Sequence, residues 1–367
     1  MTTVQQVITL MEQLAPRSYA ESWDNVGLMV GDRNAIVTGV LTTLDVTEEA
    51  ISYATEHDCN LIVSHHPLIF KGLKQLSCDT AQGRMINQLI QHNIAVYSAH
   101  TNLDIAPGGL NDMLAEQLGL IDVKGFIKTG EDVLYKITTF VPENAADAVR
   151  MAMGAAGAGR IGNYEYCSFS AHGEGRFVGN DDSHPVIGEA GSMIVVPEVQ
   201  INALVDGIHL QHVIEAMKDA HPYEEAAYEV LSLVEPKGAT QYLGRIGRLP
   251  NALNLDTFRE WVQEALPEAN IRFAGVAPQE IQSIALCSGA GAEFIKDAAR
   301  LRVDAYITGD VKYHDAQLAK ELGLLVVDAG HFGTESIVAS GLRDYLLSKD
   351  ISVPVKAFIE QNDFFFL

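Results

Sequence analysis

The 367-residue sequence is poor in cysteine and in long apolar runs. Its four cysteines, at positions 59, 78, 167 and 287, show no CxxC spacing, which argues against a disulfide framework and a thiolate zinc site. No apolar run approaches the roughly 18 residues that a membrane helix needs. The first residues, MTTVQQVITLMEQLAPRS, lack the basic stretch and cleavage pattern of a signal peptide. We therefore expect a cytoplasmic protein with no membrane partner.

Basic residues are outnumbered by acidic ones. The chain has 25 Lys and Arg against 48 Asp and Glu, which gives a formal net charge of −23. Affinity for phosphate backbones should therefore be poor, and direct nucleic-acid binding is not expected. A single nucleotide remains a candidate ligand where metals supply the counter-charge. With 47% hydrophobic and 20% charged residues, the composition is that of a globular protein, and the length allows two or three domains.

Short apolar strands alternate with helical segments at both ends of the chain. The predicted strands are 37–44, 60–63 and 94–98, and then 281–287, 303–307 and 323–327. Between them lies a strand–helix–strand–strand–helix–strand pattern, which is the order of a ferredoxin-like domain. The fold class that we predict is α/β. Two α/β halves, residues 1–127 and 237–367, form a metal-binding core that a ferredoxin-like α+β insertion, residues 128–236, interrupts.

Histidine and carboxylate side chains follow three of the predicted strands. His65 and His66 follow strand 60–63, Asp104 follows 94–98, and His331 and Glu335 follow 323–327. Sites in open α/β sheets form outside the carboxyl ends of the strands. The spacing of His331 and Glu335 places them on one face of a helix, from which Glu335 could bridge two ions. Mixed imidazole and carboxylate ligands suit Zn, Mn, Fe, Co or Ni better than Ca or Mg.

Several of these residues also have a purely structural explanation. Glu335 in a first helical turn would favour the helix dipole, and Asp104 could serve a turn before Pro107. Asp45 resembles a helix cap as much as a catalytic group. The turn Ser288–Gly291, between a strand and a helix, could cradle an anion on its backbone N–H groups. The gathering of ligand types at three strand ends favours the metal site over the separate explanations.

Several stretches resemble the GTP cyclohydrolase I type 2 family, also called the dinuclear-metal-centre hexameric proteins. They are WDNVGLMVG (23–31), SHHPLIF (64–70), SAHTNLD (98–104), ITGDVKYHDA (307–316) and GHFGTE (330–335). The middle region, with HPYEEAAYEV (221–230), is similar to the PII- or CutA-like insertion of the longer bacterial members. The resemblance implies that the five metal ligands are His65, His66, Asp104, His331 and Glu335, with Glu335 bridging two ions. It also implies a homohexamer.

The functional hypothesis is a hydrolase that depends on two divalent metal ions per subunit. Two close ions lower the pKa of a bridging water and clamp the substrate. The reaction that the resemblance implies is opening of the purine ring of GTP with loss of formate, in which His100 or His314 would move protons. Hydrolysis of a nucleotide or another phosphoester uses the same machinery, with Lys312 or the Ser288–Gly291 turn meeting a phosphate. The alternative is a non-catalytic, metal-binding regulatory oligomer whose insertion senses a ligand.

Overall fold

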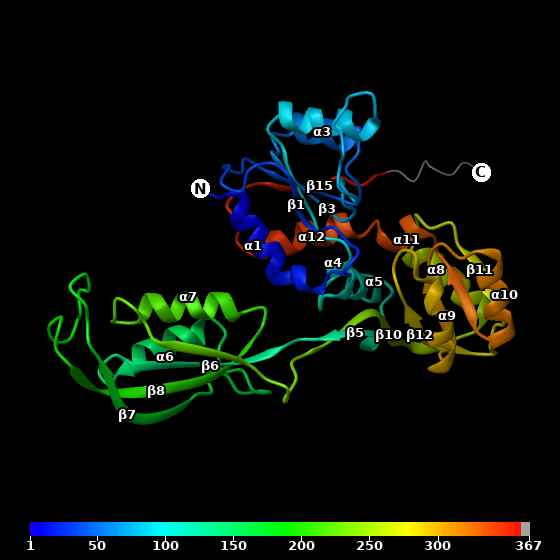
Figure 1. Cartoon of the computed structure of the whole chain (residues 1–367). Coiled ribbons are helices and arrows are strands. Elements are labelled where there is room, and N and C mark those ends of the chain that lie inside the picture. The colour runs from blue at the N-terminus through cyan, green and yellow to red at the C-terminus, as the bar shows by residue number, and fades with distance from the viewer. Residues whose placement is uncertain (361–367) are drawn as a thin grey trace. The chain divides into compact units, whose positions relative to one another are not determined.

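The computed structural model describes residues 1–360, which form two compact units (Figure 1). Unit 1 contains residues 1–130 together with the chain from Gln241 onward, and unit 2 contains residues 131–240. Within residues 1–360, no helix has the length and apolar character needed to cross a membrane. Each unit has its own buried core, so each is described separately.

A five-stranded sheet forms the first layer of unit 1, in the order β1-β4-β3-β2-β15. Its strands are β1 (Gly27–Val30), β2 (Val40–Thr43), β3 (Leu61–Ser64), β4 (Ala95–Ser98) and β15 (Val355–Ala357). Strands β15, β2, β3 and β4 are parallel, and β1 is antiparallel to β4. All residues of β2, β3 and β4 are buried, as expected for parallel strands covered on both faces.

Helices from both ends of the chain pack against this sheet. They are α1 (Val4–Leu14), α2 (Glu48–Glu56), α3 (Ala81–Gln91), α4 (Thr101–Ile105), α5 (Leu110–Gln117) and α12 (Val338–Leu347), with a short 3₁₀ turn at Arg17–Tyr19. Helix α1 begins at a capping box, in which Thr3 and Gln6 satisfy each other's backbone N–H groups. Its apolar face shares one core with Leu61 of β3 and Leu342 of α12.

A six-stranded sheet forms the second part of unit 1, in the order β11-β14-β13-β12-β10-β5. Its strands are β5 (Ile121–Glu131), β10 (Thr240–Leu253), β11 (Arg272–Gly275), β12 (Ile281–Leu286), β13 (Ala305–Thr308) and β14 (Leu325–Asp328). Strands β12, β13 and β14 are parallel. The helical segments here are α8 (Leu255–Ala265), the 3₁₀ turn Gly291–Phe294, α9 (Ile295–Arg300), α10 (Tyr313–Leu322) and α11 (His331–Glu335).

The two sheets of unit 1 exchange elements along the chain. Strand β5 comes from the N-terminal part of the sequence but is an edge strand of the six-stranded sheet. Strand β15 and helix α12 come from the C-terminal part but pack in the five-stranded sheet and its core. The predicted mixed α/β class is confirmed. The two predicted halves are separate segments of the sequence, but each of them contributes strands to both sheets.

Unit 2 contains a single four-stranded antiparallel sheet, in the order β7-β8-β6-β9. Its elements are β6 (Leu134–Pro142), α6 (Ala146–Ala155), β7 (Phe169–Phe177), β8 (Ile194–Asp206), α7 (Leu210–Ala220) and β9 (Tyr228–Ser232). The core of the unit joins Ile137 and Ile201 of the sheet to Val149 of α6 and Met217 of α7. Both helices therefore cover the same face of the sheet.

Candidate metal centre

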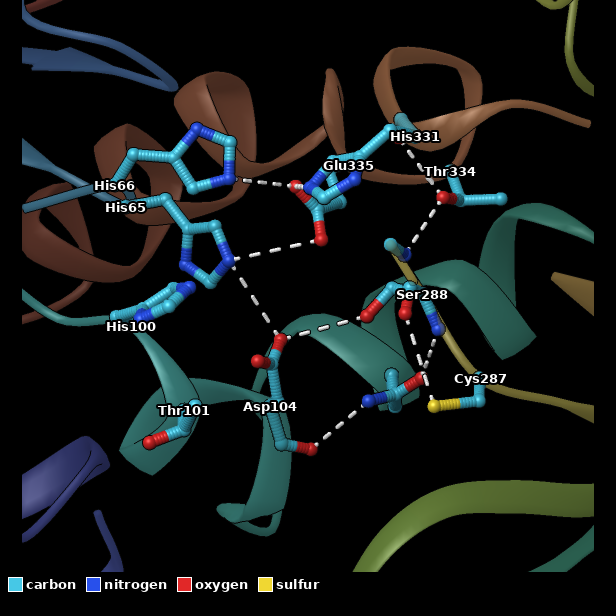
Figure 2. Close-up of polar contacts among 12 residues, drawn as sticks. His65, His66, His100, Thr101, Asp104, Cys287, Ser288, His331, Thr334 and Glu335 are labelled. Atoms are coloured by element: carbon cyan, nitrogen blue, oxygen red, sulfur yellow. Dashed lines mark hydrogen bonds and ion pairs between the residues drawn. The ribbon is translucent and has the colours of Figure 1, made fainter. Parts of the chain in front are cut away.

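The five residues predicted as metal ligands lie together in unit 1 (Figure 2). His65 and His66 directly follow β3, and Asp104 lies in α4, just after β4. His331 and Glu335 are the first and last residues of α11, which follows β14. Because β3 and β4 belong to one sheet and β14 to the other, the cluster is assembled from the strand ends of both sheets.

Four imidazoles at this site form a hydrogen bond to an oxygen atom through the same ring atom, Nδ1. The pairs are His65 with the Ala99 carbonyl (2.8 Å), His66 with Asp45 (2.9 Å), His100 with Asp24 (2.9 Å) and His331 with Asp310 (2.9 Å). Carbonyl and carboxylate oxygens only accept hydrogen bonds, so each Nδ1 must carry the proton. Each Nε2 is therefore left to face the other imidazoles and the carboxylates.

The Nε2 atoms lie close to carboxylate oxygens. Glu335 Oε2 is 3.0 Å from His66 Nε2 and 3.1 Å from His331 Nε2. His65 Nε2 is 3.7 Å from Asp104 Oδ1 and 3.9 Å from Glu335 Oε1. Within the described chain, the buried atoms His65 Nε2 and Glu335 Oε2 have no partner in hydrogen-bond geometry. Buried acceptors that face one another need a cation between them, either a proton or a metal ion.

Burial and the adjacent carboxylates have opposite effects on the imidazoles. Complete burial lowers the pKa of His65 to about 3. Burial acts in the same direction on His66, but its hydrogen bond to Asp45 and the adjacent negative charge of Glu335 outweigh it and raise the pKa of His66 to about 10. The same balance raises the pKa of His331 to about 9. Without a metal ion, protons on His66 and His331 therefore supply the positive charge.

The two buried carboxylates differ from each other. Burial, and then the charge of Glu335, raises the pKa of Asp104 to about 7. Burial also opposes ionisation of Glu335, but the imidazoles of His331 and His66 close to its carboxylate outweigh this effect and hold the pKa of Glu335 well below its ordinary value. Glu335 thus stays negatively charged at the centre of the cluster, where Figure 2 shows it between His66 and His331.

Asp45 orients a histidine and does not cap a helix. Its carboxylate accepts a hydrogen bond from His66, whereas α2 is capped by Thr47, whose side chain accepts from the Ala50 N–H. Asp45 had two interpretations from the sequence, and neither was this one. Its contact with His66 could not be foreseen, because 21 residues and a complete helix separate them.

Two further aspartates, not assigned from the sequence, hold other histidines of the cluster. The buried Asp24 side chain accepts hydrogen bonds from His100 and from the hydroxyl and N–H of Thr101. Asp310, in the loop after β13, has a positive φ of 57° and accepts from His331. Both belong to motifs visible in the sequence, WDN and TGD, but local spacing does not reveal which histidine each would contact.

The turn Ser288–Gly291 is not an anion cradle, so this prediction is wrong. Three of its backbone N–H groups already donate to side chains: Ser288 to Asn111 (2.9 Å), Gly289 to Thr334 (2.9 Å) and Gly291 to Thr308 (3.1 Å). The turn instead closes one side of the metal centre. A Cβ at Gly289 would lie 2.2 Å from Glu335 Oε1, and the φ of Gly289 is +62°, so this position requires glycine.

The helix-dipole explanation of Glu335 also fails. Helix α11 has five residues, and Glu335 is the last of them. A negative charge at the C-terminal end of a helix gains nothing from the helix dipole. The i, i+4 spacing does place the side chains of His331 and Glu335 together, as predicted.

A cavity of about 720 Å³ opens beside the cluster within unit 1. His100, Asp104, His331 and Glu335 line its polar side. Its apolar lining includes Trp23, Phe70 and Phe294. The rings of Trp23 and Phe70 are 5.9 Å apart, and they lie 6.2 Å and 6.4 Å from the ring of His100. His100 therefore lies between the cluster of candidate ligands and an aromatic wall.

His314 is not brought to this cavity. It lies exposed in α10, with its ring against that of Tyr313, and is not among the residues that line the cavity. Of the two histidines predicted to move protons, only His100 lies beside the metal cluster.

Comparison with known proteins places this architecture in a family. The sequence model of the Duf34/NIF3 (NGG1p interacting factor 3) family matches residues 2–363. A Bacillus subtilis (strain 168) protein named GTP cyclohydrolase 1 type 2 homolog is 41% identical over 361 residues, which are 98% of this chain and 96% of that protein.

Solved structures extend the similarity to the whole fold. The crystal structure of a Bacillus cereus protein related to NIF3 is 38% identical, with a TM-score of 0.85, and the match covers 100% of this chain and 99% of that one. A Staphylococcus aureus crystal structure is 33% identical, with a TM-score of 0.72 and coverage of 100% and 99%. The four matches agree with the resemblance seen in the sequence motifs. This chain belongs to the Duf34/NIF3 family.

Proposed function

We propose that the protein is a metal-dependent hydrolase that holds two divalent ions on His65, His66, Asp104, His331 and Glu335. The observation that carries this proposal is the orientation of the imidazoles. Each Nδ1 donates to an oxygen outside the cluster, and each Nε2 faces the carboxylates. Histidines that bind metals usually donate their other N–H group to a carboxylate or a backbone carbonyl in this way.

The distances support two ions. One trio of ligand atoms comes from His66, His331 and Glu335, and another from His65, Asp104 and Glu335, with all atoms of a trio within 4.8 Å of one another. In a tetrahedral site with bonds of about 2.0–2.1 Å, ligand atoms lie about 3.3 Å apart. The four distances between a histidine Nε2 and a carboxylate oxygen here range from 3.0 to 3.9 Å. Glu335 belongs to both trios, which is the position of a bridging carboxylate. Zn, Mn, Fe, Co and Ni all accept such ligands.

Bound ions would lower the pKa of a coordinated water and hold an oxygen of the substrate. The protein itself would move the protons. Asp24 keeps the proton of His100 on Nδ1, so Nε2 is left to accept a proton from the attacking group or to return it to the product. We assign this role to His100 in preference to His314, because His100 lines the cavity and His314 lies outside its lining.

The aromatic lining of the cavity suits a flat substrate. Trp23 and Phe70 are 58% and 41% exposed beside the cluster, and stacking against them would stabilise an aromatic ring. A purine fits this description, and the relatives carry the name GTP cyclohydrolase 1 type 2 homolog. The proposed reaction is hydrolytic opening of the guanine ring of GTP with release of formate. Hydrolysis of a nucleotide phosphoester is the second candidate reaction for the same residues.

The deciding experiment is a turnover assay on protein loaded with each of the five metals. GTP, other nucleotides and a simple phosphomonoester are offered in turn, and both formate and phosphate are measured. We expect turnover that EDTA abolishes and that His65→Ala removes. The matched control is His57→Ala, since His57 lies at the end of α2, outside the cluster. Activity that survives EDTA and His65→Ala equally would refute the metal-dependent hydrolase.

Unit 2 supports the second candidate function, a regulatory oligomer with a ligand-sensing insertion. We propose that residues 131–240 form the predicted ferredoxin-like insertion, because the element order β-α-β-β-α-β and the sheet order β7-β8-β6-β9 suit that fold. A cavity within this unit favours ligand binding. The hexamer that the family resemblance implies is also a proposal, and light scattering of the purified protein tests it directly.

A further inference from the structure

The face of the unit 2 sheet that carries no helix holds a cavity of about 570 Å³. Residues 199 and 201 of β8 point into the core under α6 and α7. Because side chains alternate along a strand, Glu198 and Gln200 point to the opposite face, and both line the cavity. This site lies entirely within unit 2 and is independent of the metal centre.

A buried carboxylate forms part of the cavity wall. Glu198 is only 8% exposed, and its Oε1 accepts a hydrogen bond from the hydroxyl of Tyr223 at 2.8 Å. Burial and this carboxylate raise the pKa of Tyr223, so its hydroxyl remains a donor. Among residues 1–360, Glu198 forms no ion pair. A carboxylate removed from water without a cation is costly, which leaves this one in need of a positive partner.

The arginine that lines the cavity is already paired. Arg176 donates to Glu174 at 2.6 Å, and His184 lies 3.8 Å from Glu224. The positive charge of Arg176 is therefore already used, and Glu225 adds a further carboxylate to the lining, whereas Glu198 has only the neutral hydroxyl of Tyr223.

Two glycines of β7 leave room over Glu198. A Cβ at Gly175 would lie 2.2 Å from Glu198 Oε2, so any larger residue would displace the carboxylate. A Cβ at Gly173, the register partner of Glu198, would meet nothing within 4 Å, which shows open space above the strand. Beside this space, the rings of Phe177 and Tyr223 meet edge to face, with centroids 5.9 Å apart.

We propose that this cavity binds a small organic ammonium ion with an apolar body. The ammonium group would donate to Glu198 and neutralise its charge, and the body would pack against Phe177 and Tyr223. Aromatic faces add to the attraction, because a cation is drawn to the negative face of a ring. An anionic ligand would meet the Glu198 carboxylate, and a neutral one would leave it unpaired.

The test uses the full chain and three probes with one phenyl ring each. Phenethylammonium carries the charge, 2-phenylethanol is its neutral counterpart, and 3-phenylpropionate is its anionic counterpart. Ligand-observed NMR titration should show that phenethylammonium binds, with a Kd of roughly millimolar or tighter for so small a ligand. The affinity for phenethylammonium should weaken roughly tenfold or more in Glu198→Gln, as expected for a lost hydrogen bond between charged groups. Glu229→Gln, an exposed change on β9 of the same sheet, is the matched control.

Two further variants keep the test decisive if Glu198→Gln does not fold. Tyr223→Phe retains the ring and the carboxylate, so binding should persist. Gly175→Val fills the space over the carboxylate and should abolish binding. The proposal is overturned if phenethylammonium does not bind, if the alcohol or the propionate binds as tightly, or if folded Glu198→Gln or Gly175→Val binds it as the unmodified chain does.

Discussion

Asp310 never reaches the centre of the metal cluster, yet its hydrogen bond decides which nitrogen of His331 faces inward. The same is true of Asp45 for His66 and of Asp24 for His100. Affinity for a metal ion should therefore depend on these aspartates as well as on the ligands themselves.

The Asp310→Ala variant tests this dependence. Without its acceptor, the His331 ring can rotate or change tautomer, so metal affinity should fall about 10–100-fold. Asp310→Asn keeps an acceptor oxygen and should lose less. Competition with a chromogenic chelator measures both. Asp344→Ala, which removes an exposed carboxylate paired with Arg343, is the control and should bind metal normally. An unchanged affinity in Asp310→Ala would show that the hydrogen bond has no role in ligation.

Glu335→Gln should change the number of bound ions. The amide removes the negative charge shared by the two trios and one strong oxygen donor, so repulsion between the ions increases and at least one is lost. Metal content per subunit, measured after identical loading, gives the answer. Glu293→Gln is the matched control, because Glu293 lines the same cavity but belongs to neither trio. Two ions retained at unchanged affinity in Glu335→Gln would rule out the bridging role.

Metal binding should release protons. The pKa of His66 is about 10 and that of His331 about 9, so both imidazoles are protonated at pH 7 in the metal-free protein. An ion must displace these protons. At pH 7 to 8, about two protons should leave per subunit, and fewer at pH 9, where half of the His331 side chains have already lost theirs; affinity should rise with pH until it levels off above about 10. Titration in weakly buffered solution measures the release. Affinity independent of pH over this range would contradict the assignment, and His66→Ala should reduce the release to about one.

The sequence predicted which residues gather at the site but not which hydrogen-bond partners orient their side chains. His65 and Asp104 were predictable as neighbours, because the parallel strands β3 and β4 end at one edge of the first sheet. Glu335 follows β14 of the other sheet, and its place beside them depends on how the two sheets pack. The contacts of Asp45 and Asp310 depend on how loops from different strands fold over one another. No local pattern contains that information.

At the scale of elements, buried apolar strands were predicted well and edge elements poorly. Strands β3, β4, β12 and β14 are short, continuous apolar runs, and their positions matched within a few residues. The long strands β5 and β10 are largely exposed or half-buried, so they lack an apolar run. The pairing of β15 with the first sheet depends on tertiary packing. Its three residues are too few to form a pattern from which a strand could be predicted.

One ion pair joins α5 to β10, and its loss should destabilise unit 1. Arg245 is almost completely buried and donates to both carboxylate oxygens of Asp112, at 2.5 and 2.8 Å. Asp112→Ala leaves the guanidinium buried without its counter-charge, which should lower the free energy of unfolding by about 3 kcal/mol. Denaturant unfolding measures the loss. The exposed pair Arg300 and Asp297 provides the control, since Asp297→Ala should cost less than about 1 kcal/mol. Equal losses would mean that the buried pair contributes no more than a surface pair.

At the scale of the whole molecule, the chain passes from unit 1 into unit 2 through β5 and returns through β10. These two strands are neighbours in the six-stranded sheet. Just beyond, the Asp132 N–H donates to the Ala239 carbonyl at 2.8 Å, and Gly238 donates to the Asp132 carbonyl at 3.0 Å. The two chain segments are thus side by side where unit 2 begins. Unit 1 could be closed there by a short turn.

Replacing residues 132–239 with Asn-Gly, the preferred two-residue hairpin turn, should leave unit 1 folded with the metal content of the full chain. The reason is that the buried core clusters and all five proposed ligands of unit 1 lie outside the deleted segment. Metal analysis and thermal unfolding test it. A second variant with a five-residue flexible linker controls for strain in the tight turn. If neither variant folds, residues 131–240 are not a separable insertion.

The order of the ligands along the chain has a consequence for synthesis on the ribosome. His65, His66 and Asp104 emerge first, and Glu335 follows 231 residues after Asp104. A nascent chain thus offers only part of the proposed centre, which would hold an ion loosely and exchange it quickly. The second set of ligands arrives with α11, after β14 has taken its place in its sheet. Tight loading with metal would then have to wait for α11, so a metal-filled centre would mark a chain in which both sheets of unit 1 have formed.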